Sequence, residues 1–119
     1  MTKVTEKIDL NELKEDYNSY IKRVQQGTLK IAEDFRQKDI KNGLGSITDF
    51  AEGMDWIIAV NKHFSLNDIP TSFDEKKIIG FLEEINEALS VQDYFLVADL
   101  FEYEIAGYFA EIPDVIIKN

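Results

Sequence analysis

Four acidic residues have the spacing that a carboxylate metal site on two helices would need. Glu52 and Asp55 are three residues apart, as are Asp99 and Glu102, so each pair would share one side of an α-helix. Hard cations such as Mg²⁺ prefer oxygen ligands of this kind. A two-metal site in a helical bundle also needs Glu-x-x-His pairs, and the chain contains none. We therefore interpret the four carboxylates as solvated residues and expect no metal and no cofactor.

The alternative is a small-molecule or divalent-metal-binding enzyme that uses these carboxylates in a pocket between two helices. The residue types that serve as general bases and nucleophiles give it little support. His63 is the only histidine and there is no cysteine, so thiol nucleophiles, disulfides and thiolate zinc sites are excluded. The Gly43-Leu44-Gly45 segment lacks the third glycine of a nucleotide-binding motif. The sequence predicts that the protein is not an enzyme.

The charge of the chain limits its possible partners. The net charge is −10, and residues 63–119 contain three Lys/Arg against twelve Asp/Glu. Nucleic acids need a protein surface of the opposite sign, and the same field repels anionic membranes. We therefore expect neither to be a partner. A partner protein with a basic surface suits this charge, although an acidic balance also serves solubility alone.

Length and hydropathy predict a single cytoplasmic domain that covers residues 1–119. Apolar residues make up 45% of the chain and charged residues 30%, which is ordinary for a globular protein. The N-terminus lacks the pattern of a signal peptide, and no window approaches 18 uncharged apolar residues.

Helical periodicity accounts for most of the chain, and strand-like alternation is not sustained anywhere. Residues 1–8 are expected to be a flexible lead-in, and residues 112–119 an apolar tail that packs back onto the helices. Because the connections are short, the pattern predicts an all-α, antiparallel, up-down-up-down four-helix bundle. The expected helices cover about 9–38, 40–64, 72–90 and 93–111.

Local signals set some details of these helices. Asp39 is expected to cap the second helix, and Ser72 with Glu75 matches a capping box for the third. Gly27 lies on the apolar side of the first helix, where we interpret it as a point of close approach between helices.

The second and fourth helices are expected to have two apolar faces each, whereas a helix in a simple bundle needs one. A large apolar face beyond the core often marks a contact with another molecule. We therefore expect a protein–protein interaction module, whether adaptor, chaperone-like or regulatory, that forms a homodimer or binds another protein. The expected contact residues are Trp56, Val60 and Phe64 on the second helix and Leu96, Leu100 and Tyr103 on the fourth.

Two short segments resemble a known family. The sequence FAEGMDWIIAV at residues 50–60 contains a small-Glu-Gly-x-x-Trp motif, and VADLFEYEIAGYF at residues 97–109 contains Ala-Asp-Leu-x-Glu-Tyr-Glu. Both are similar to segments of a family of small, acidic, all-helical proteins of unknown function from low-GC Gram-positive bacteria. The resemblance implies a helical bundle in a bacterial cytosol. It implies no activity and no catalytic residue.

Overall fold

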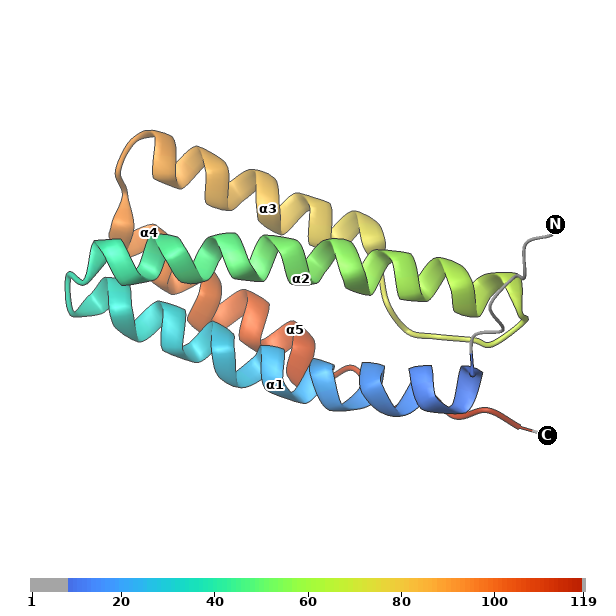
Figure 1. Cartoon of the computed structure of the whole chain (residues 1–119). Coiled ribbons are helices and arrows are strands. Elements are labelled where there is room, and N and C mark those ends of the chain that lie inside the picture. The colour runs from blue at the N-terminus through green and yellow to red at the C-terminus, as the bar shows by residue number, and fades with distance from the viewer. Residues whose placement is uncertain (1–8, 119) are drawn as a thin grey trace, which may run out of the picture.

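Four antiparallel helical rods form the molecule (Figure 1). The computed structural model describes residues 9–118, so the expected lead-in at 1–8 lies outside the described residues. Within that range no strand occurs, and the predicted all-α four-helix bundle is confirmed. No helix in the same range is both long and apolar enough to cross a membrane. The helices are α1 (Leu10–Arg36), α2 (Ile40–Leu66), α3 (Glu75–Ser90) and a fourth helix made of α4 (Tyr94–Asp99), η1 (Leu100–Ile105) and α5 (Ala106–Ala110).

Each of the four rods begins with an aspartate whose carboxylate accepts a backbone N–H of the first turn, which satisfies a donor that has no partner within the helix. The prediction that Asp39 caps α2 is confirmed, since its Oδ1 accepts the N–H of Asn42 at 3.4 Å. The other caps are Asp9, Asp74 and Asp93.

The capping box predicted at Ser72 is wrong, because α3 begins at Glu75 and Asp74 is its cap. The reason is a tertiary contact. The hydroxyl of Tyr108 accepts the backbone N–H of Asp74 at 2.8 Å, which holds Asp74 in an extended conformation until the helix begins.

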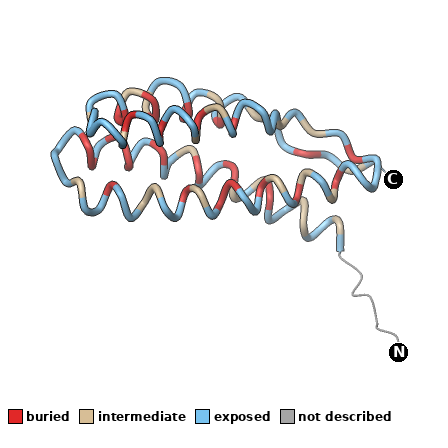
Figure 2. The backbone as a smooth tube through the Cα atoms, turned by 90° about the horizontal axis from the view of Figure 1, so that it is seen from above, coloured by how far each residue is buried: buried red, intermediate tan, exposed pale blue. Residues whose placement is uncertain are grey.

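The order of the rods around the bundle places α2 diagonally opposite the fourth helix. Among the described residues, no Cα of α2 comes within 8 Å of a Cα in α4, η1 or α5. Aromatic rings fill the space between them: the ring centre of Phe50 on α2 is 5.3 Å from that of Phe101 and 6.4 Å from that of Phe109. Figure 2 shows the buried residues along the inner sides of the helices. The space between the second and fourth helices, where the enzyme alternative would need a pocket, is therefore occupied by core.

The fourth helix changes its hydrogen-bond pattern at its centre. At the end of η1 the N–H of Ala106 is donated to the carbonyl of Phe101, five residues earlier, as in a π-helix. This wider turn changes which side chains face inward. Leu100 is 1% exposed and lies in the core beside Phe101, so the prediction that Leu100 belongs to an outer face is wrong.

The outer face expected on α2 is also mostly buried. Val60 and Phe64 are core residues, and the ring of Phe64 meets that of Tyr17 on α1 at 5.5 Å. The C-terminal tail covers the same end of the bundle. The side chain of Asn18 accepts the N–H of Val115 at 2.8 Å and donates to its carbonyl at 3.1 Å, and the Val115 side chain is buried.

The close approach between α1 and α2 occurs at glycines of α2 and not at Gly27. A Cβ added at Gly27 would meet nothing within 4 Å, so the interpretation of Gly27 as a point of close approach is wrong. A Cβ at Gly43 would lie 2.6 Å from the ring of Phe35, and a Cβ at Gly53 would collide with the hydroxyl of Tyr20. These two α2 glycines therefore leave room for aromatic side chains of α1.

Alanine substitutions at Gly27 and Gly43 should have opposite effects on stability. Gly27→Ala should raise the free energy of unfolding by up to about 1 kcal/mol, because alanine favours the helix and nothing blocks its methyl group. Gly43→Ala should lower it by about 1 kcal/mol or more, because the methyl group displaces the packed ring of Phe35. Urea denaturation followed by circular dichroism measures both. Equal effects of the two substitutions would contradict this packing.

Candidate functional site

The six residues predicted to contact a partner do not form one surface. Val60, Phe64 and Leu100 are buried in the core, whereas Trp56, Leu96 and Tyr103 are 37%, 43% and 68% exposed. Trp56 packs against Tyr17 and Tyr20 of α1, but Leu96 and Tyr103 belong to the diagonally opposite helix. The expected site across the second and fourth helices is therefore corrected to two separate surfaces.

The first surface is an aromatic ridge on the outer side of the fourth helix, formed by Phe95, Leu96 and Tyr103. Phe95 is 75% exposed, more than any residue in the predicted set, and sequence reasoning missed it. Phe95 and Tyr103 are eight residues apart with Asp99 midway, a spacing typical of one side of a helix. That spacing could have identified the ridge.

Arg36, at the end of α1, holds the ridge together. Its Nη2 donates to Oδ1 of Asp99 at 2.8 Å, and its Nε donates to Oε1 of Glu102 at 2.9 Å. Its guanidinium carbon lies 5.6 Å from the ring centre of Phe95 and 5.9 Å from that of Tyr103, within the range of cation–π attraction. Hydrogen bonds to Asp99 and Glu102 raise the pKa of Arg36 above its ordinary value, so the guanidinium stays charged.

This arrangement also shows where the four carboxylates of the metal-binding alternative lie. Asp99 and Glu102 face α1 and neutralise Arg36, while Glu52 and Asp55 lie exposed on the diagonal helix. Nowhere in residues 9–118 do three or more His, Cys, Asp or Glu side chains group in a way that could hold a metal ion. His63 is partly buried near the end of α2, without a grouped carboxylate set around it.

A hollow of about 660 Å³ adjoins the ridge at the end of the bundle where the α1–α2 and α3–α4 turns meet. Its lining includes Ile40, Ala98 and the rings of Phe35 and Tyr94, which stack at 5.7 Å. Phe95 lines the hollow and also belongs to the ridge. The two features are therefore one continuous surface that could receive an apolar side chain of another molecule.

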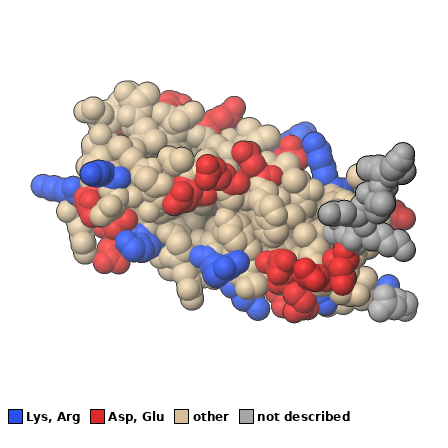
Figure 3. All heavy atoms as spheres, viewed as in Figure 1, with Lys and Arg blue, Asp and Glu red and all other residues tan. Residues whose placement is uncertain are grey.

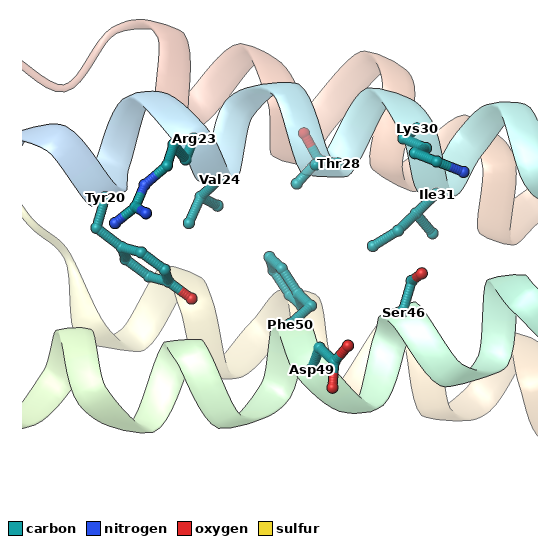
Figure 4. A pocket seen from close by; sticks show the side chains of 10 residues that line it. Tyr20, Arg23, Val24, Thr28, Lys30, Ile31, Ser46, Asp49 and Phe50 are labelled. Carbon is teal, nitrogen blue, oxygen red and sulfur yellow. The ribbon is translucent and has the colours of Figure 1, made fainter.

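The second surface is a groove of about 290 Å³ between α1 and α2, shown in Figure 4. Val24 and Ile31 of α1 and Phe50 of α2 form its apolar part. At one end, Tyr20 and Arg23 extend from α1 towards α2, and Trp56 meets Tyr20 edge to face at 5.2 Å just beyond. Sequence reasoning selected Trp56 but assigned it to the outer face of one helix, whereas it packs at the seam between two.

Aspartate substitutions at Leu96 and Leu100 test which of the two side chains lies on the ridge and which lies in the core. Leu100→Asp should lower the free energy of unfolding by about 4 kcal/mol or more, because it buries an unpaired carboxylate. Leu96→Asp should change it by less than about 1 kcal/mol, because Leu96 is 43% exposed and an aspartate there stays in contact with water. Thermal unfolding followed by circular dichroism tests both variants. A well-folded Leu100→Asp protein would contradict the inward position of that side chain.

The comparisons with curated proteins and with solved structures gave no match. A family model for a domain of unknown function matches residues 12–114, a range that includes all four helices except the first two residues of α1. This agrees with the resemblance to an uncharacterised family. The chain therefore belongs to the family described as domain of unknown function DUF8042.

Proposed function

We propose that the protein is a protein–protein interaction module, of the adaptor, chaperone-like or regulatory kind, and that it binds its partner through the aromatic ridge and the adjoining hollow. The observation that carries this proposal is the exposure of two large aromatic side chains, Phe95 at 75% and Tyr103 at 68%, on either side of a charged arginine. The proposal includes no catalytic step.

The composition of the ridge is that of an interaction hot spot. Tyrosine, arginine and other aromatic residues are enriched at the centres of protein interfaces. A phenylalanine or tyrosine side chain buries roughly 150–250 Å², and apolar burial contributes roughly 25 cal/mol per Å². Covering two rings could therefore contribute several kcal/mol. Asp99 and Glu102 already hold Arg36 in place. The Arg36 side chain therefore has little conformational entropy left to lose when a partner binds.

The charge around the ridge favours a partner with a basic surface over a second copy of the same chain. No Lys or Arg occurs between Ile78 and Ile117, and that stretch contains Glu83, Glu84, Glu87, Asp93, Glu104, Glu111 and Asp114 besides the two carboxylates paired with Arg36. Lys38 lines the hollow, but two copies that met through the fourth helix would bring its carboxylates together, which costs binding energy. A basic rim on the partner would instead speed association. The bacterial, cytoplasmic setting implied by the family resemblance is part of the same proposal.

The proposal predicts that partner capture depends on the two exposed rings. Immobilised protein should retain a specific partner from a lysate of its source cells, and the double variant Phe95→Ser/Tyr103→Ser should retain at least about tenfold less. Leu66→Ser is the matched control, since Leu66 is 83% exposed at the far end of α2, and it should retain the partner in full. Association should slow as salt rises from about 10 mM to 150 mM, because the screening length falls to roughly 8 Å.

Two results would contradict this proposal. Equal retention by the double variant and by Leu66→Ser would remove the ridge from the interface. The second result would come from sedimentation velocity: a dimeric wild type and a monomeric double variant. That outcome would show that a second copy of the chain binds the ridge, and would contradict the proposal of a partner with a basic surface.

A further inference from the structure

The groove between α1 and α2 combines an apolar surface with charged groups that form no ion pair among the described residues. Tyr20, Arg23 and Asp49 line both the groove and the neighbouring hollow at Gly53 and Trp56. Over the range that the structure describes, neither Arg23 nor Asp49 forms an ion pair. The other described arginine, Arg36, forms ion pairs with two carboxylates. Arg23 therefore remains without an ion pair in a fold that does supply carboxylates to an arginine elsewhere.

Arg23 is held in position even though no carboxylate of residues 9–118 pairs with it. Its guanidinium carbon lies 5.5 Å from the ring centre of Tyr20, and Tyr20 in turn packs edge to face against Trp56. The absence of a side chain at Gly53 makes room for the Tyr20 hydroxyl. An ordered guanidinium loses less entropy when it binds a carboxylate through two parallel hydrogen bonds.

The opposite wall of the groove carries the opposite charge. Asp49 and Ser46 belong to α2 and line the groove on the side opposite Val24 and Ile31 of α1 (Figure 4). On the larger scale, Figure 3 shows basic atoms over the middle of α1 and a band of acidic atoms over α2 on the same face of the molecule. A ligand with a single charge would be attracted by one wall and repelled by the other.

We propose that this groove binds a small zwitterionic molecule with an apolar side group, of which the apolar α-amino acids are the simplest members. The carboxylate lies against Arg23, the ammonium group lies against Asp49, and the apolar group lies on Val24, Ile31 and Phe50. A volume of about 290 Å³ is at the small end of the range for ligand sites and suits a molecule of this size. This site is separate from the aromatic ridge and does not depend on the function proposed for the ridge.

Tyr20 supplies a third polar contact. Burial raises the pKa of Tyr20, an effect that Arg23 opposes and Asp49 reinforces. The phenol therefore stays protonated, and its hydroxyl, which lies beside Gly53, is available to donate a hydrogen bond to the ligand. Apolar contact with convergent polar groups is the usual composition of a small-molecule site.

Titration with L-leucine and L-phenylalanine tests the proposal. The intact protein is followed by two-dimensional ¹H–¹⁵N NMR and by the fluorescence of Trp56, the only tryptophan, which adjoins Tyr20. Both amino acids should cause saturable shifts at the amides around Arg23 and Asp49. Leucinamide lacks the carboxylate and 4-methylpentanoate lacks the ammonium group, so each should bind at least about tenfold more weakly. Absence of saturable shifts up to the solubility limit of leucine would overturn the proposal, and so would equal affinity for all three leucine-type probes.

Charge-neutral variants locate the two ends of the ligand. Arg23→Gln and Asp49→Asn should each weaken leucine binding at least about tenfold. The matched controls are Lys22→Gln and Asp55→Asn. Lys22 is an exposed residue next to Arg23 in the sequence, and Asp55 is an exposed residue of α2. These should bind as the wild type does. An equal loss in variant and control would show a general effect of net charge and would overturn the assignment.

A groove-filling variant provides a test that does not alter charge. A side chain at Gly27 would meet no described atom within 4 Å of its Cβ, and Gly27 lines the groove. Gly27→Leu should therefore fold normally and lose at least about tenfold in affinity for leucine. Gly107→Leu, at an equally open and exposed glycine on α5, should retain it. Unchanged binding by a folded Gly27→Leu protein would place the ligand elsewhere and overturn the proposal.

Discussion

The hydrogen bond from the Ala106 N–H to the Phe101 carbonyl sets the arrangement of the fourth helix. It spans five residues instead of four, so the chain takes up an additional residue in one turn. Without that residue, the 100° step of an α-helix would place Leu100 nearly opposite the core stripe. With it, Leu100, Phe101 and Ile105 all lie in the core, at 1% exposure or less. One wide turn thus converts a two-faced sequence into a helix with a single broad buried side.

That conversion determines what remains at the surface. Because Leu100 is used for packing, the exposed large apolar side chains of the fourth helix are Phe95, Leu96 and Tyr103. Asp99 and Glu102 fall on the side facing α1, where both reach Arg36. The aromatic ridge is therefore neither an extension of the core nor a random set of exposed side chains. It is organised by one arginine whose charge is balanced within the fold, and this leaves the two rings exposed at the surface.

The sequence predicted the elements well because the helices depend on local signals. Hydrophobic periodicity gave the four helices to within about three residues at each end, and Asp39 was recognised as a cap from its residue type alone. The start of α3 was wrong because it depends on Tyr108, a residue 34 positions away from Asp74. The prediction that Gly27 marks a close approach between helices was wrong for a related reason. Which glycine permits close approach depends on where Phe35 and Tyr20 point, and no local pattern contains that information.

The candidate sites were predicted less well, since each combines distant segments. Trp56, Leu96 and Tyr103 were correctly placed outside the buried core, but their separation onto opposite sides of the molecule follows from the order of the helices around the bundle. Phe95 and Arg36 were missed because their importance comes from contact with each other. The Tyr20–Arg23–Asp49 group likewise joins two helices. A pattern within one helix does not identify such a group.

The most direct test of this account is to identify the hydrogen-bond acceptor of the Ala106 amide. NMR scalar couplings across N–H···O=C hydrogen bonds report the acceptor carbonyl for each amide in a uniformly ¹⁵N,¹³C-labelled protein. The structure predicts a coupling from the Ala106 nitrogen to the Phe101 carbonyl, five residues earlier. A coupling to the Glu102 carbonyl would show a regular α-helix. It would return Leu100 to the outer side, and would contradict both the packing of the core and the composition of the ridge.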